Sequence, residues 1–300
     1  MLAWILMALL GLGALVAAYA VFVERRWYRL VRHRLDILPA GTAGLTVLHL
    51  SDLHLTEADG RAASFLATLP RADVTVLTGD ALGDPSAVEF VARALRPVRG
   101  RVASMFVLGS NDLYAPRPSN WLRYFFPTLR SKPRLGRRGR PADLIRLLER
   151  DGWVHLKNRK YERRTNGLRM EVVGLDDPHV HRADIRVADR TGSGVFGLAV
   201  VHSPDPAPEL AALGYDLVVA GHTHGGQVRL PVIGALVTNC TIPTRLARGL
   251  ARIGPSYLHV SPGMGTSKYA PFRLFCRPEA TLLELGPAQP PDRIRSYTAS

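Results

Sequence analysis

Short apolar runs recur along the chain and alternate with more polar segments of helical or loop character. Runs of four to eight apolar or β-branched residues between turn residues are typical of β-strands. We predict strands at Leu45–Leu50, Val74–Thr78, Met105–Leu108, Met170–Gly174, Leu198–His202, Leu217–Ala220, Leu258–Val260 and Ala280–Leu285. Helices are predicted at Ala62–Leu69, Ala87–Leu95 and Pro141–Asp151. Strands that alternate with helices predict an α/β fold.

The first apolar run has a different character. Leu2 to Val23 contains no charged residue and is long enough to cross a hydrocarbon core as a helix. One interpretation is a secretory signal peptide, since Ala18-Tyr19-Ala20 resembles a cleavage site. A signal peptide begins with basic residues, however, and no Lys or Arg precedes Glu24. We therefore favour an uncleaved transmembrane anchor.

Arginines follow this run at once, at Arg25, Arg26, Arg29, Arg32 and Arg34. Arginines beside a transmembrane segment stay on the cytoplasmic side, which predicts a single-pass protein of the cell membrane with a cytoplasmic domain. The predicted organisation is an anchor at 1–23, a basic juxtamembrane linker at 24–43, one large domain at 44–286 and a flexible, proline-rich tail at 287–300.

Composition and charge narrow the class of protein. Of the 300 residues, 47% are apolar and 21% are charged, which is a globular composition. The formal net charge of +14 favours anionic partners: phosphorylated substrates, anionic lipid or nucleic acid. Cys240 and Cys276 lie far apart and outside any C-x-x-C pair, which argues against a disulfide framework or a cysteine zinc site.

Polar residues capable of binding metals follow five of the predicted strands. They are Asp52 and His54, Asp80, Asn111, His202, and His222 with His224. Each stands at the carboxyl end of a strand, where ligands bind in open α/β sheets. Glycines beside them allow the backbone to approach a crowded centre. We predict that these seven side chains form one metal site.

Their chemistry suits hard or borderline cations. Carboxylate, imidazole and amide oxygen ligands favour Mn, Fe or Zn over soft metals. Two cations about 3.5–4 Å apart stabilise attack on a phosphate, and a carboxylate can bridge them. Such a pair lowers the pKa of bound water, which gives a hydroxide nucleophile near neutral pH.

The order D-x-H, G-D, G-N-x, H and G-H-x-H resembles the calcineurin-like metallophosphoesterases. The runs His202-Ser203-Pro204-Asp205 and Gly221 to Gln227, with Pro271 to Glu279, are similar to a bacterial subgroup of membrane-attached phosphodiesterases. The resemblance implies a β-sandwich flanked by helices. It implies one metal on Asp52, His54 and His224, a second on Asn111, His202 and His222, and Asp80 as the bridge.

One motif departs from the family. Where the family has histidine after the asparagine, this chain has Asp112. An aspartate donates a proton near neutral pH only if burial raises its pKa. We predict Asp112, Asn111 and His54 as catalytic residues, with His179 and His181 as alternative replacements for the missing histidine.

The leading hypothesis is hydrolysis of a phosphodiester or pyrophosphate bond by a metal-bridging hydroxide. The resemblance extends the substrate to nucleotide- or lipid-linked phosphates, with a UDP-diacylglucosamine-type hydrolase as one example. A basic, aromatic insertion between Tyr114 and Ala142 favours a membrane-facing role or is a solvated loop. The alternatives are a degenerate metal-binding membrane scaffold and a nuclease. The sequence contains no recognisable nucleic-acid-binding module, which weakens the nuclease alternative.

Overall fold

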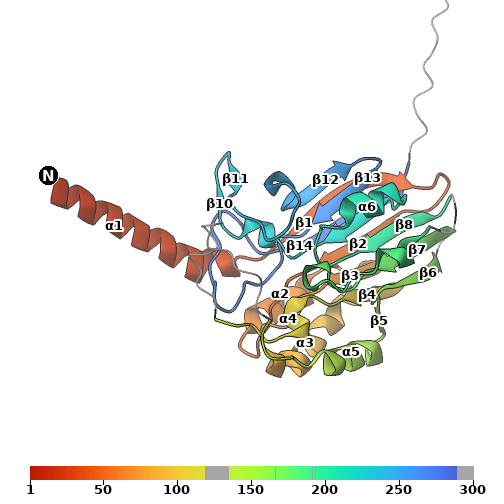
Figure 1. Cartoon of the computed structure of the whole chain (residues 1–300), viewed down its shortest axis with the longest axis horizontal. Helices are drawn as coiled ribbons and strands as arrows, with labels where there is room; N and C mark the ends of the chain where they lie inside the picture. Colours follow the sequence, from red (N-terminus) through yellow and green to blue (C-terminus); the bar gives the residue numbers. More distant parts are fainter. Residues whose placement is uncertain (119–134, 166, 191, 193, 289–300) are drawn as a thin grey trace, which may run out of the picture.

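Two six-stranded sheets pack face to face in the computed structural model, which describes residues 1–118, 135–165, 167–190, 192 and 194–288. Helices α2 to α5 cover one sheet, and a single long helix, α1, projects from the domain (Figure 1). The predicted sandwich flanked by helices is confirmed. The central part of the basic insertion, residues 119–134, lies outside the described residues, as does most of the predicted tail.

The first sheet has the order β1-β14-β2-β3-β4-β5. Strands β2, β3, β4 and β5 run parallel, β14 runs antiparallel to β2, and β1 lies at the edge parallel to β14. The strands are β1 (Arg29–Leu38), β2 (Leu45–Leu50), β3 (Val74–Thr78), β4 (Ala103–Val107), β5 (Trp153–His155) and β14 (Glu279–Pro287). The helices are α2 (Gly60–Thr68), α3 (Val88–Leu95), α4 (Ser110–Leu113) and α5 (Pro141–Arg150).

The second sheet has the order β12-β13-β9-β8-β7-β6. Its four central strands are parallel, and β12 and β6 are antiparallel edges. The strands are β6 (Arg159–Thr165), β7 (Leu168–Gly174), β8 (Phe196–Val200), β9 (Leu217–Ala220), β12 (Gly249–Ile253) and β13 (Ser256–Val260). Helix α6 (Ala207–Ala212) covers its outer face, and β10 (Arg229–Leu230) pairs with β11 (Gly234–Ala235) in a hairpin.

The central strands of both sheets are largely apolar because both of their faces are buried. In β9, Leu217 and Val219 enter the core between the sheets, while Val218 and Ala220 pack under α6. In β2, Leu45 and Val47 face the inter-sheet core, and Leu48 and Leu50 face the core under the helices. This sandwich brings the carboxyl ends of the parallel strands of both sheets to one edge.

The strands that sequence analysis missed lie mainly at sheet edges. Arg29–Leu38, within the predicted linker of residues 24–43, pairs with β14 along its length, and Arg29 forms a 2.8 Å ion pair with buried Glu279. Strand β6 carries four Lys or Arg residues and stays largely exposed. Edge strands commonly carry charged residues, because charge discourages pairing with other chains. The charged residues interrupt the apolar pattern from which strands are predicted.

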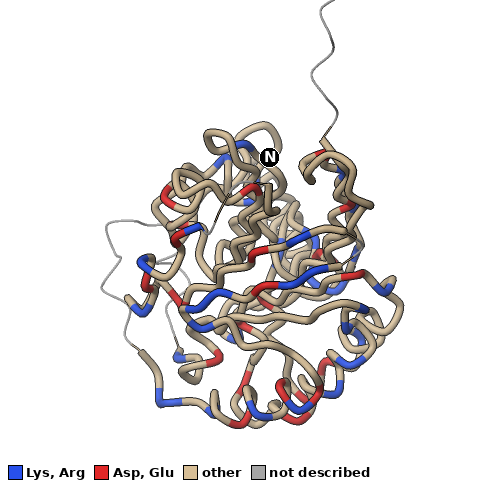
Figure 2. Tube along the Cα trace, turned by 90° about the vertical axis from the view of Figure 1, so that its right-hand side faces the viewer, with Lys and Arg blue, Asp and Glu red and all other residues tan. Residues whose placement is uncertain are grey.

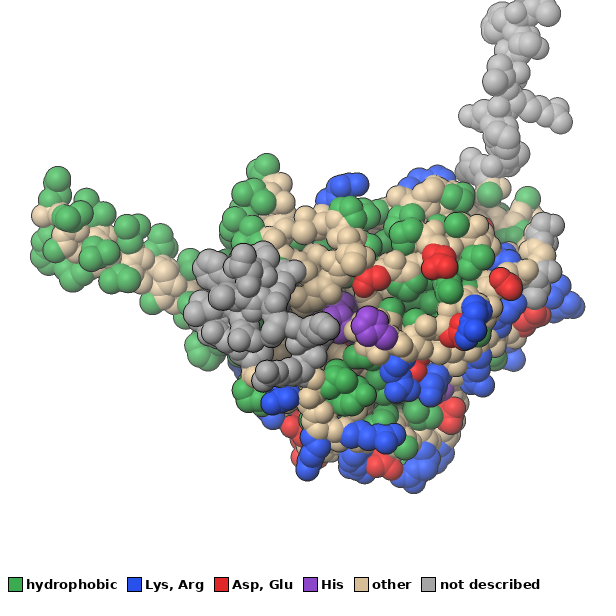
Figure 3. Space-filling model, viewed as in Figure 1, with side chains coloured by type: hydrophobic (Ala, Val, Ile, Leu, Met, Phe, Trp, Pro, Cys, Tyr) green, Lys and Arg blue, Asp and Glu red, His purple; other side chains and the backbone are tan. Residues whose placement is uncertain are grey.

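Helix α1 (Leu2–Ala18) continues without a break through a π-helical and a 3-10 turn to Arg26. Within the described residues, Leu2–Arg26 is the one helix long and apolar enough to cross a membrane. None of the residues of α1 is buried against the domain, and hydrophobic side chains cover its length (Figure 3).

Candidate metal centre

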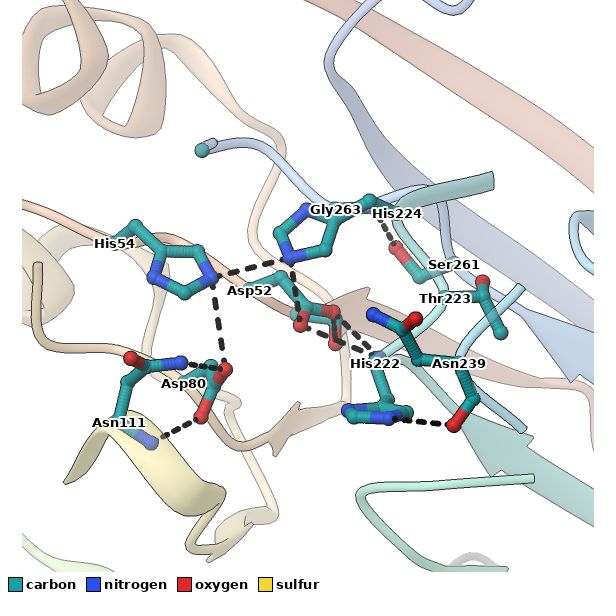
Figure 4. Close-up of polar contacts among 12 residues, drawn as sticks. Asp52, His54, Asp80, Asn111, His222, Thr223, His224, Asn239, Ser261 and Gly263 are labelled. Carbon is teal, nitrogen blue, oxygen red and sulfur yellow. Dashed lines mark hydrogen bonds and ion pairs between the residues drawn. The ribbon is translucent and has the colours of Figure 1, made fainter. Parts of the chain in front are cut away.

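Seven predicted ligands come together where the two sheets meet. Figure 4 shows Asp52, His54, Asp80, Asn111, His222 and His224 converging from loops that follow the strands of both sheets. His202, fully buried after β8, lies beside them, with its Nε2 3.3 Å from His222 Nδ1. The strand-end pattern thus placed seven side chains in one cluster, although they span more than half of the chain.

The backbone at this cluster is held in an unfavourable conformation. Asp52, His54, Asp80, His222 and His224 all have positive φ angles, between 43° and 68°. A left-handed conformation at a residue other than glycine costs about 1–3 kcal/mol and persists where the surroundings impose it. Each strand turns sharply at its end and directs the next side chain into the cluster.

Glycines make room for the ligands. A Cβ atom at Gly109 would lie 2.2 Å from Asp80 Oδ1, and one at Gly221 would lie 2.4 Å from Asp52 Oδ2. A Cβ at Gly79, whose φ is +88°, would meet Gly109 N at 2.5 Å and His202 Nδ1 at 2.8 Å. These glycines therefore allow the two sheets to approach each other at the cluster.

Two groups of three side chains have the spacing that a metal ion requires. The first is Asp52, His54 and His224, and the second is Asp52, Asp80 and His202. In each group the donor atoms lie within 4.8 Å of one another. Asp52 belongs to both groups, whereas the family resemblance assigns the bridge to Asp80.

Asp80 nevertheless lies between the two groups. Its Oδ2 is 3.5 Å from His54 Nε2, and its Oδ1 is 3.7 Å from His202 Nε2. Asn111 donates its backbone N–H and side-chain amide to the same carboxylate, at 2.8 and 2.6 Å. Asn111 is thus fixed next to Asp80, with its amide group at the edge of the cluster.

The histidines are oriented by their second nitrogens. His202 Nδ1 donates to the carbonyl of Thr78 at 2.7 Å, which turns Nε2 toward the cluster. Metal-binding histidines commonly have such an outer partner, since it sets the tautomer and the ring orientation. His54 and His224 bring their Nε2 atoms within 3.2 Å of each other. Facing nitrogens beside buried carboxylates suit a cation held between them.

The electrostatics also favour cations. Burial opposes a charge on Asp80, but His202 and His54 outweigh it and hold the pKa of Asp80 below its usual range. Burial lowers the pKa of His202, yet Asp80, Asp177 and Asp52 raise it overall to about 9. Burial and the neighbouring His202 lower the pKa of His222 to about 3. The carboxylates therefore draw positive charge into the cluster, and the donor set fits divalent ions.

Asp112, the predicted general acid, points elsewhere. Its Oδ1 accepts the N–H of Leu82 and its Oδ2 accepts the N–H of Gly109, both at 3.0 Å. Burial, with Asp80 nearby, raises the pKa of Asp112 to about 7. The raised pKa meets the condition set for proton donation by Asp112. Both of its oxygens already accept backbone N–H groups, however, and these bonds stabilise the turn that carries Asn111.

The two alternative histidines are placed differently. The His179 ring lies 4.5 Å from the His222 ring, centroid to centroid, and is half-buried. His181 is exposed, and no ring contact ties it to the cluster within the described residues. Of the two, His179 is the one that borders the metal ligands.

Sequence analysis missed Asp177 and the partners of the histidines. Asp177 is fully buried after β7, its Oδ1 accepts the N–H of His179, and its Oδ2 has no hydrogen-bond partner in the described structure. It follows a strand, as the predicted ligands do, so the same rule would have found it. His202 and His222 donate to the backbone carbonyls of Thr78 and Asn239. These partners could not be predicted from the sequence, because every residue has a backbone carbonyl.

The crowding at Gly79 gives a prediction. Gly79 and Gly214 have the same φ, +88°, but a Cβ atom at Gly214 would meet nothing within 4 Å. We expect Gly214→Ala to lower the free energy of unfolding by about 1 kcal/mol through backbone strain alone. Gly79→Ala should lower it further and weaken metal binding at least tenfold, measured by denaturant melts and calorimetric titration with Mn²⁺. Equal effects of the two substitutions would show that the close approach is unimportant.

Comparisons with known proteins agree with this geometry. The sequence profile described as calcineurin-like phosphoesterase matches residues 45–226. An uncharacterized metallophosphoesterase, YkuE of Bacillus subtilis, is 23% identical over 92% of this chain and 93% of its own length. Phosphodiesterase YaeI of Escherichia coli is 26% identical, over 89% of this chain and 92% of its own.

A relative from Bos taurus is named as a transmembrane protein with metallophosphoesterase domain. It is 27% identical over 83% of this chain, which corresponds to 54% of the length of that protein. The profile match spans more than half of the chain and includes every predicted ligand. This chain therefore belongs to the calcineurin-like phosphoesterase family.

Proposed function

We propose that the protein is a dinuclear metal-dependent phosphoric ester hydrolase that cleaves a phosphodiester or pyrophosphate bond. The observation that carries the proposal is the pair of donor groups that share Asp52, at the junction of the two sheets. A relative that bears the name phosphodiesterase supports the same class of reaction. Two divalent ions held by these residues would supply Lewis acidity and lower the pKa of the attacking water.

The side chains divide between two ion positions. Asp52, His54 and His224 would hold one ion, and Asn111, His202 and His222 the other. Asp80 would lie between them, because its two oxygens face one histidine of each set. Asn111 is positioned by Asp80, and turning its amide would present the oxygen as a ligand. His54 would serve as a metal ligand and would also border the site where the substrate reacts.

His179 takes the place of the family's missing motif histidine in this proposal. It approaches the cluster from the second sheet, beside His222, whereas the motif histidine would follow Asn111 on the first sheet. The backbone N–H of His179 donates to the Asp177 carboxylate at 2.8 Å, which fixes the turn that carries His179 beside the ligands. An imidazole there would donate a hydrogen bond to a phosphoryl oxygen or to the leaving group.

We further propose that α1 anchors the protein in the cell membrane and that the hydrolase domain is cytoplasmic. The arginines at the domain end of the helix support this orientation, since basic residues flank the cytoplasmic end of transmembrane segments. An anchored active site suits a lipid-linked substrate, of which UDP-diacylglucosamine is one type, or a nucleotide-linked one.

Two other functions are weaker. A degenerate scaffold would have no need of strained backbone at five ligand positions, since such strain is retained at functional sites. A nuclease would present a continuous basic surface to the phosphate backbone. In the view of Figure 2, Lys and Arg alternate with Asp and Glu along the same strands and helices.

The central prediction concerns the metals. Asp80→Ala should release both ions and lower turnover of bis(4-nitrophenyl) phosphate by more than about two orders of magnitude, since even outer partners of metal ligands contribute 10–100-fold. Asn111→Ala should spare the first ion more than the second. Metal content by mass spectrometry and turnover with Mn²⁺, Fe²⁺ or Zn²⁺ measure both effects.

A matched control is Glu162→Ala, which removes a carboxylate from the exposed edge strand β6. It should change neither metal content nor turnover. Two bound ions and full activity in Asp80→Ala would overturn the ligand assignment. Two ions without turnover of any phosphodiester in the wild-type protein would favour the scaffold.

The two histidines that follow β7 give a second prediction. Removing a hydrogen-bond donor to a transition state lowers kcat by about 10²–10³-fold. His179→Ala should lower kcat by about a hundredfold at unchanged metal content, with the larger effect on substrates with poor leaving groups. His181→Ala removes an imidazole ring from an exposed position and should have little effect. Loss of a metal ion in His179→Ala would instead assign it to the support of His222.

The orientation is tested by a reporter fused after Ala288. A reporter that folds only in the cytoplasm should be active in the fusion, and the purified protein should retain the apolar segment Leu2–Val23. A reporter active only outside the cytoplasm would reverse the orientation. A mature protein that begins near Val21 would show that the apolar segment is a cleaved signal peptide.

A further inference from the structure

A cavity of about 280 Å³ lies between the end of the apolar helix and the metal centre. It is lined by Arg25, Arg26 and Tyr28 and by the loop Met264–Lys268. His54, a predicted metal ligand, forms part of the lining. The cavity therefore borders both the membrane-side segment and the reaction site.

The cavity is cationic. Arg25, Arg26 and Lys268 line it, against one carboxylate, Asp59. Asp59 Oδ2 already accepts the backbone N–H and the hydroxyl of Thr56, at 2.8 and 2.7 Å. Lys268 pairs with Asp84 at 3.0 Å, but the Nε of Arg25 is buried without a hydrogen-bond partner in the described structure. An anionic group in the cavity would give the Nε of Arg25 a partner and would lie beside the charge of Arg26.

The position of the arginines relative to the helix is fixed. Buried Glu24 accepts the N–H groups of Phe275 and Cys276, at 3.0 and 2.6 Å, and Ala20 accepts the N–H of Arg273 at 3.1 Å. Arg277 stacks on Trp27 at 3.9 Å and donates to its carbonyl. The helix end is thus docked on the domain, so the cavity lies at the level where the apolar segment ends.

Along this segment an apolar surface is followed by basic residues, which corresponds to the acyl chains and the anionic headgroup of a membrane lipid. Phe22 and Val23 are exposed and apolar, and Arg25 and Arg26 follow within one turn. Acyl chains would lie along the exposed side chains of the helix while the headgroup enters the cationic cavity. Pockets for drug-sized ligands begin at about 300 Å³, so the cavity suits a headgroup and not a whole lipid.

We propose that this cavity binds the phosphate-bearing headgroup of an anionic membrane lipid. Bound there, the lipid would hold the bilayer surface beside His54 and present lipid-linked phosphates to the metal centre. Arginine forks bind phosphate oxygens through paired hydrogen bonds, which explains two adjacent arginines at this point. The binding site itself does not depend on the proposed hydrolysis.

The test is lipid retention by the full chain, purified in mild detergent and examined by native mass spectrometry. With phosphatidylglycerol added, the wild-type protein should retain one lipid per chain, at least tenfold more tightly than phosphatidylcholine. Arg26→Gln and Lys268→Gln should each lower this retention about tenfold. Arg34→Gln removes the same charge from an exposed position on β1, outside the cavity, and should leave retention unchanged.

Each other outcome contradicts the proposal. Equal retention of the two lipids, or equal loss in all three variants, would show that general charge attracts lipid. Equal binding of soluble glycerol phosphate would assign the cavity to free phosphate compounds instead of lipid. The same measurement on Asp80→Ala separates this proposal from the catalytic one, because lipid retention there should persist without turnover.

Discussion

Two buried carboxylates surrounded by imidazoles dominate this structure. Asp52 and Asp80 are almost fully buried at the junction of the sheets, where an uncompensated charge would be strongly destabilising. Four histidines reach them from both sheets, and the pKa of His202 is raised to about 9 because three carboxylates act on it. The two sheets therefore meet at a centre that requires positive charge. A divalent ion meets this requirement better than a proton, because it has two charges and contacts several ligands at once.

The same constraint explains the polar residues of the inter-sheet core. Thr78 accepts from His202 through its carbonyl, and its hydroxyl lies 3.0 Å from His49 Nε2. His49 in turn contacts His259 across the two sheets, with 2.8 Å between their Nδ1 atoms. Burial lowers the pKa of His49 to about 3, so the ring is neutral and acts as a hydrogen-bonding link. A chain of polar groups thus ties the metal-binding edge to both sheets.

Sequence predicted the centre of this fold better than its edges. Strands β2, β3 and β9 match the predicted ranges, because strands buried on both faces are continuous apolar runs. Strands β1 and β6 carry several basic residues, and their place in the fold comes from pairing with β14 and β7, which their own sequence pattern does not contain. The clustering of the candidate ligands was predictable because strand ends concentrate function, whereas the direction of the Asp112 carboxylate was not, since backbone amides decide it.

The connection between the helix and the metal centre is a continuous set of buried contacts. Arg273 is fully buried and donates to the carbonyls of Pro262, Gly263 and Gly265, and its own N–H bonds to the helix end at Ala20. Gly265 in turn donates to the carbonyl of Asp52 at 2.6 Å. An arginine buried in this way is strongly destabilising unless every partner is retained. Arg273 thus contacts both the helix end, through its backbone N–H, and the loop behind Asp52, through its guanidinium. A flexible tether at this point would leave the backbone N–H of Arg273 without its partner. The folded arrangement therefore fixes the candidate metal centre at a defined distance from the end of the apolar helix.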